Sequence, residues 1–172
     1  MKAIRTLAAA LLCLALFGVT GVPRAAHAAD SPAFWKYQVK GDFGEVLNHL
    51  RHGLAAGQFI LTAEENLSKG LENNKHLFPA GQWNTIGFDN VTAVHFCSVV
   101  FNQEVFNINM DWSILCPFKV VAYTMKQAPK DVTIIMLRPT YLLERDPNKR
   151  AREIGGKIED RIINAIKEGL SH

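Results

Sequence analysis

The chain has 172 residues, 48% of them hydrophobic and 20% charged, which excludes a disordered tail and a polytopic membrane protein and favours one domain. Its formal charge of +3 comes from the first 28 residues, where Lys2, Arg5 and Arg24 have no acidic counterpart. Without these three, 16 of the 19 basic residues remain against 16 acidic residues. A neutral remainder argues against nucleic-acid binding, because such binding depends on a positive field that displaces counterions.

The first 28 residues have the features of a secretory signal peptide. Lys2 and Arg5 precede an apolar run over residues 7–19, and Ala26-His27-Ala28 places small residues where a signal peptidase cleaves. The run is too short to cross about 30 Å of hydrocarbon, which takes roughly 20 residues. We therefore expect cleavage after Ala28, a periplasmic or secreted mature protein, and no stable membrane span after processing.

The next part of the chain alternates strand and helix patterns. Residues 34–39 predict a strand that ends before Asp42, which is placed as a helix N-cap. Apolar residues at helical spacing then predict a helix as far as residue 56. Residues 59–62 indicate a second strand, and residues 67–78 predict a polar helix that Pro79 ends.

The second half of the chain begins with an irregular segment over residues 83–90, followed by a buried strand over residues 91–97. Ser98 is placed to cap a helix that runs to residue 108. Residues 115–125 predict a strand, residues 126–131 a turn, and residues 132–138 another strand. The last two strands should form an antiparallel hairpin.

A final amphipathic helix is predicted to begin at Asp146-Pro147, because Asp caps helices well and proline suits the first helical position. Its apolar face reaches Leu170, and its opposite face carries charges of both signs, which is typical of a solvated surface. The order is strand, helix, strand, helix, strand, helix, strand, strand, helix. This order predicts an α+β or α/β domain in which a single sheet has helices packed on it.

One pattern in the chain is similar to a known family. His95-Phe96-Cys97-Ser98, the helix after it and Cys116-Pro117-Phe118 resemble the bacterial family called domain of unknown function 302, as do Gly41-Asp42-Phe43 and the helix that follows them. The resemblance covers residues 34–139 and implies a small fold with helices over a sheet, often in envelope proteins, and no established activity. We divide the chain into a signal peptide (1–28), this domain (29–145) and a C-terminal amphipathic helix packed on it (146–172).

Cleavage would leave Cys97 and Cys116 as the only cysteines, and three interpretations of the pair are open. A disulfide needs Cα atoms about 4.4–6.8 Å apart. If the helix between the cysteines is a plain crossover between parallel strands, they lie more than about 12 Å apart. If residues 107–115 double back along the helix, the strands are antiparallel and the cysteines meet. Two buried cysteines that act as small apolar side chains are the third interpretation.

A soft-metal or thiol-redox site is the remaining one of the three interpretations. His95 and Cys97 share one face of a strand, and Cys116 with Met110 or Met125 could complete a site for copper(I) or zinc. Cys97 also precedes a predicted helix, whose N-terminus favours a reactive thiolate. No cofactor is evident in the sequence.

The chain has an export signal and no recognisable catalytic constellation or phosphate-binding motif. We therefore expect an exported envelope module and favour a binding protein over an enzyme. Its partner would be an unidentified small molecule, an envelope protein, or a second copy of the chain in a homodimer. The alternative is a redox, sulfur-handling or soft-metal-binding protein that uses Cys97 and Cys116.

Overall fold

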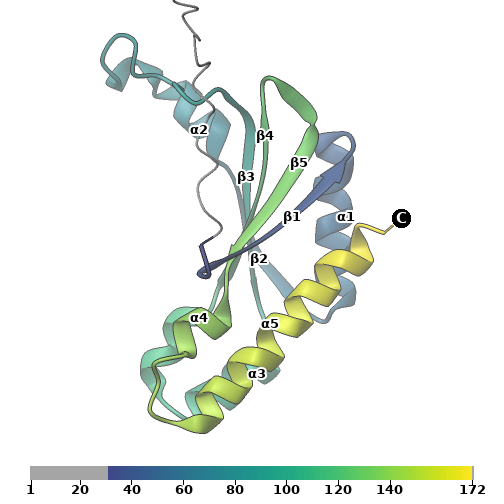
Figure 1. The fold of residues 1–172 in the computed structure, drawn as a ribbon, viewed down its shortest axis with the longest axis vertical. Coiled ribbons are helices and arrows are strands. Elements are labelled where there is room, and N and C mark those ends of the chain that lie inside the picture. The colour runs from purple at the N-terminus through teal and green to yellow at the C-terminus, as the bar shows by residue number, and fades with distance from the viewer. Residues whose placement is uncertain (1–30, 172) are drawn as a thin grey trace, which may run out of the picture.

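A computed structural model describes residues 31–171 of the protein (Figure 1). The predicted signal peptide lies outside these residues. Five antiparallel strands form one sheet in the order β1-β5-β4-β3-β2. The strands are β1 (Phe34–Lys40), β2 (Ile60–Asn66), β3 (Phe88–Cys97), β4 (Phe118–Met125) and β5 (Ala128–Leu137). The predicted single sheet with helices packed on it is confirmed, and its antiparallel strands make the fold α+β.

The helices follow the predicted order, with one addition. They are α1 (Phe43–Ala56), α2 (Leu67–Asn73), α3 (Val99–Phe106), α4 (Pro139–Leu143) and α5 (Lys149–Gly169), with short 3₁₀ helices η1 (Lys75–Leu77) and η2 (Met110–Leu115). None of these helices combines the length and apolar character that a membrane span requires. Because β1 and β2 are the two edge strands, α1 crosses the sheet between them.

The core lies between the sheet and the helices α1 and α5, which contact each other. On the central strands, alternate side chains such as Val120, Ala122 and Ile134 are completely buried in this core. Leu50 and Leu54 on α1 and the isoleucines of α5 supply the other half of it. Burial of this apolar surface is the main source of stability for the domain.

Several predicted boundaries differ from the structure, and those of β5 and α5 differ for clear physical reasons. Strand β5 begins at Ala128, not at residue 132, because Met125 pairs with Ala128 and only two residues form the turn. Pro129 is tolerated because the pairing of β5 with β1 extends only to Asp131. Helix α5 begins after Asn148, whose Oδ1 accepts the Arg150 N–H at 3.0 Å.

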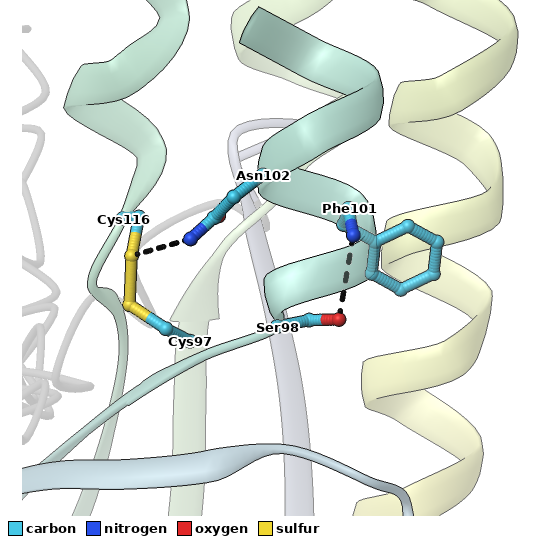
Figure 2. Close-up of a disulfide and its surroundings, with 5 residues drawn as sticks. All are labelled: Cys97, Ser98, Phe101, Asn102 and Cys116. Carbon is cyan, nitrogen blue, oxygen red and sulfur yellow. Dashed lines mark hydrogen bonds between the residues drawn. A yellow bond between two sulfur atoms is a disulfide. The ribbon is translucent and has the colours of Figure 1, made fainter.

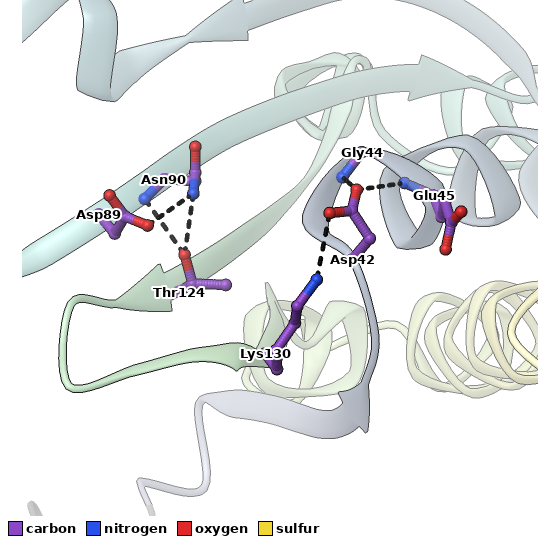
Figure 3. A network of polar contacts seen from close by, with 7 residues as sticks. All are labelled: Asp42, Gly44, Glu45, Asp89, Asn90, Thr124 and Lys130. Atoms are coloured by element: carbon purple, nitrogen blue, oxygen red, sulfur yellow. Dashed lines mark hydrogen bonds and ion pairs between the residues drawn. The ribbon is translucent and has the colours of Figure 1, made fainter.

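Asp42 caps α1 as predicted, and it forms a small polar network (Figure 3). Its Oδ1 accepts the N–H groups of Gly44 at 2.9 Å and Glu45 at 3.4 Å, and its Oδ2 lies 3.4 Å from Lys130 Nζ. The hydrogen bonds from the Gly44 and Glu45 N–H groups, and then the one from Lys130, hold the pKa of Asp42 below its ordinary value.

We predict that the stabilisation contributed by the Asp42 carboxylate is lost at acid pH. Because its folded pKa is lowered, the stabilisation is present above the unfolded pKa of about 3.9 and is lost as the pH falls through the folded pKa. Asp42→Asn keeps a good N-cap but cannot titrate. The difference in urea unfolding midpoint between wild type and Asp42→Asn should therefore become smaller as the pH is lowered from 5 through the pKa of Asp42 in the folded protein. A constant difference over that range contradicts the assignment.

Candidate functional site

The Cys97–Cys116 disulfide joins the end of β3 to the residue before Pro117 and β4 (Figure 2). Its sulfur atoms are 1.95 Å apart, and its Cα atoms are 5.6 Å apart. Beside it, Ser98 Oγ accepts the N–H of Phe101 in the first turn of α3 at 3.5 Å, and Asn102 Nδ2 donates to Cys116 Sγ at 3.2 Å. The disulfide therefore holds the α3–η2 segment against the end of the sheet.

The antiparallel pairing of β3 and β4 explains how the cysteines meet. Phe96 lies opposite Phe118 in neighbouring strands, so α3 and η2 double back and are not a crossover between parallel strands. Of the geometries that the sequence left open, the structure has the one that permits a disulfide. Neither cysteine is a free buried thiol in this structure.

The other residues of the soft-metal hypothesis do not gather around the sulfurs. His95 Nε2 lies 3.6 Å from Glu65 Oε2 and is buried with no hydrogen-bond partner among residues 31–171. Met110 is 62% exposed on η2, and Met125 pairs with Phe88 at the opposite end of β4. Within residues 31–171, no group of three or more His, Cys, Asp or Glu side chains is placed to hold a metal ion.

A pocket of about 380 Å³ opens next to the disulfide, at the end of the sheet where β4 begins and β5 ends. We call it the apolar pocket. Its wall comes from β1, η2, the neighbouring ends of β4 and β5, α4 and α5, and includes Phe34, Ile114, Leu115, Pro117, Val121, Ile135, Leu137, Pro139, Leu142 and Ile162. Its volume lies in the range of about 300–1,000 Å³ that is typical of small-molecule sites.

Several of the lining side chains are apolar and open to solvent. Ile114 is 78% exposed, Phe34 is 46% exposed and Leu137 is 42% exposed. Among the described residues 31–171, Lys119 is the only charged one in the lining. It pairs across the strands with His95 and makes no ion pair within residues 31–171. The pocket therefore offers apolar contact together with one positive charge.

An ion pair between half-exposed Arg138 and buried Glu159 holds the α4 side of the apolar pocket. Glu159 on α5 is 4% exposed, and its Oε1 lies 2.8 Å from both Nε and Nη2 of Arg138. Its Oε2 accepts hydrogen bonds from the N–H, at 3.1 Å, and the hydroxyl of Thr140. Charge-assisted bonds of this kind fix geometry well. They set the first turn of α4 and thus the positions of Pro139 and Leu142 in the wall.

A second buried carboxylate ties η2 to the region before α5. Asp146, which is 8% exposed, accepts a hydrogen bond from Trp112 Nε1 and one from the Asn148 N–H at 2.7 Å. The sequence predicted this residue as the helix cap. It is not the N-cap of α5, because its carboxylate accepts the hydrogen bond from Trp112 on η2, and Asn148 is the N-cap instead.

Sequence reasoning singled out the two cysteines but missed the apolar pocket beside them. One signal for it was present. Val121 lies between core-facing Val120 and Ala122, and Ile135 lies between core-facing Ile134 and Met136, so these strands are apolar on both faces. An antiparallel sheet with one solvated face normally alternates apolar and polar residues. Apolar residues on the second face therefore indicate a surface that contacts something other than water.

The family comparison agrees with the fold. The family model "domain of unknown function DUF302" matches residues 35–169, a range that includes α5. A crystal structure of an uncharacterised conserved DUF302 protein from Bacillus stearothermophilus is 18% identical, with a TM-score of 0.67, and the alignment covers 81% of this chain and 99% of that one. No curated protein matches the sequence. The chain therefore belongs to the DUF302 family, as the motifs around Cys97 and Cys116 indicated.

Proposed function

We propose that the protein is an exported binding module that takes a small apolar ligand with one anionic group into the apolar pocket. The observation that carries this proposal is the pocket itself, a 380 Å³ space walled by apolar side chains around one lysine, Lys119, that makes no ion pair within residues 31–171. Burial of an apolar chain there is favourable in proportion to the area removed from water. An anionic head would lie at Lys119, because no acidic side chain of the part of the chain that the structure describes lines the pocket.

Two features support export. The first 28 residues carry the charge, apolar run and small residues of a signal peptide. A disulfide between Cys97 and Cys116 is typical of proteins in an oxidising compartment. Mass spectrometry of the protein from its host should give an N-terminus at Ala29 in the periplasmic or secreted fraction. An N-terminus at Met1 in the cytoplasmic fraction would overturn this part of the proposal.

Binding is tested with decanoate and decanol, which share an apolar chain and differ in charge. We expect Leu137→Asp to weaken the binding of decanoate by about tenfold or more, because it places a negative charge at the pocket rim. Lys119→Gln should weaken the binding of decanoate but not that of decanol. Ile86→Asp is the matched control, because Ile86 is 72% exposed and does not line the pocket.

Isothermal titration calorimetry measures both ligands on wild type and on the three variants. The proposal is supported if wild type and Ile86→Asp bind decanoate equally and Leu137→Asp binds it more weakly. Absence of binding to wild type, or equal binding to wild type and Leu137→Asp, refutes it.

Thiol–disulfide exchange is a second candidate function, and one contact favours it. Asn102 Nδ2 donates to Cys116 Sγ, and such a donor would stabilise a thiolate on Cys116. An incoming thiolate would attack Cys97 Sγ, form a mixed disulfide there and release Cys116 as the thiolate. Asn102→Ala should then slow exchange with glutathione. Equal exchange rates in Asn102→Ala and wild type would remove this candidate.

A further inference from the structure

A second pocket lies between α2 and the start of β3, with Lys126 after the end of β4 also in its lining. The apolar pocket lies where β4 begins, so the two sites are at opposite ends of that strand. The second pocket has a volume of about 400 Å³, and its lining is mainly polar with two aromatic side chains, Trp83 and Phe88. We call it the polar pocket. The proposed function does not use it.

The aromatic side chains of the polar pocket belong to a packed cluster. The ring of Trp83 meets the ring of Phe88 edge to face at 5.8 Å between centroids, and the centroid of the Phe78 ring lies 5.5 Å from that of Trp83. Asn84 fixes this arrangement, because its side chain donates to Phe88 O at 2.7 Å and accepts the Phe88 N–H at 2.8 Å. Trp83 is thus presented by a structured loop.

Hydrogen-bonding groups lie next to these rings. Asn90 Nδ2 donates to Asp89 Oδ2 at 3.0 Å and to Thr124 Oγ1 at 3.2 Å, which orients both side chains (Figure 3). The remaining oxygens, Asp89 Oδ1 and Asn90 Oδ1, have no hydrogen-bond donor within residues 31–171. They are available to accept hydrogen bonds from a ligand.

Charges of both signs line the polar pocket. Lys69 and Lys126 supply two positive charges, and Glu72 and Asp89 supply two negative ones, of which Glu72 is paired at 2.7 Å with Lys75 outside the lining. The lining therefore mixes cationic donors with anionic acceptors. It offers donors and acceptors to a neutral ligand that carries several hydroxyl groups.

We propose that the polar pocket binds a neutral carbohydrate. A sugar ring has an apolar C–H face that packs on an aromatic ring, because the face of the ring is electron-rich. Its hydroxyl groups both donate and accept hydrogen bonds, which suits Asp89, Asn90 and the two lysines. Trp83 would stack on the sugar, and Asp89 would accept bonds from adjacent hydroxyls.

The test uses saturation-transfer NMR with two neutral probes, the trimer of glucose and the trimer of N-acetylglucosamine. We expect at least one to bind with a dissociation constant of about 1 mM. Trp83→Ala should weaken that binding by about tenfold. Asp89→Asn should weaken that binding by about fivefold, and because Asp89 is exposed the fold should not change. If Trp83→Ala does not fold, Asp89→Asn alone tests the proposal.

Tyr141→Ala is the matched control, because Tyr141 is an exposed aromatic residue outside the polar pocket. A sedimentation arm with insoluble peptidoglycan distinguishes a wall polymer from a free oligosaccharide, and either source supports a neutral carbohydrate site. The proposal is overturned if neither trimer binds, if binding survives both pocket substitutions, or if only an anionic sugar phosphate binds.

Discussion

Replacement of both Cys97 and Cys116 by alanine is expected to lower the free energy of unfolding by about 3 kcal/mol. The disulfide closes a loop over a sequence separation of 19 residues, and an open loop gives the unfolded chain more conformational freedom. The same change frees the residues on either side of Cys116, Leu115 and Pro117, which line the apolar pocket. Affinity for decanoate should therefore fall together with stability. Urea unfolding and calorimetry measure the two effects.

Reduced wild-type protein is the control for the double variant, because it loses the covalent link but keeps both side chains. Its stability should approach that of the double alanine variant. Oxidised wild type should show no alkylation under native conditions. Rapid alkylation of two thiols in wild-type protein purified without reductant would contradict a structural disulfide. An unchanged free energy of unfolding in the double alanine variant would contradict it as well.

Gly53→Ala is expected to destabilise the protein by about 1–3 kcal/mol, although alanine is a far better helix former than glycine. Gly53 lies on α1 where it crosses α5. A Cβ atom there would lie 2.4 Å from the Ala165 carbonyl oxygen and 2.8 Å from Gly169 Cα. Both are backbone atoms, so the helices would have to move apart and the core beneath them would lose contact.

Gly156→Ala is the matched substitution on α5, because a Cβ atom at Gly156 would meet nothing within 4 Å. It should stabilise the protein by about 1 kcal/mol through helix propensity alone. Thermal unfolding of the two variants should therefore move the melting temperature in opposite directions. Stabilisation by both substitutions would show that α1 and α5 do not cross at Gly53.

The sequence allowed the main elements to be predicted because local patterns determine them. Apolar residues at a spacing of three and four, with Asp42 as the cap, predict α1 without knowledge of the rest of the fold. The order of the five strands and the longer helices along the chain was predicted correctly for the same reason. Helix α4 was missed because its five residues are too few to show a period.

The site was harder to predict because it depends on distant parts of the chain. The two cysteines meet only if β3 and β4 are antiparallel, and the residues between them are compatible with either direction. The apolar pocket combines Phe34 at one end of the domain with Ile162 on the last helix. Such a juxtaposition has no local signature. Only the apolar residues on the second face of β4 and β5 pointed to it.

The most direct test of the central claim is a titration of methyl-labelled protein with decanoate, followed by NMR. The claim is that the apolar pocket beside the disulfide holds an apolar ligand. It predicts that the methyl signals of Val121, Ile135, Leu142 and Ile162 shift together and saturate, while those of Leu77 and Ile86 do not move. Shifts confined to other surfaces, or no saturable shift in these four residues, would contradict the claim.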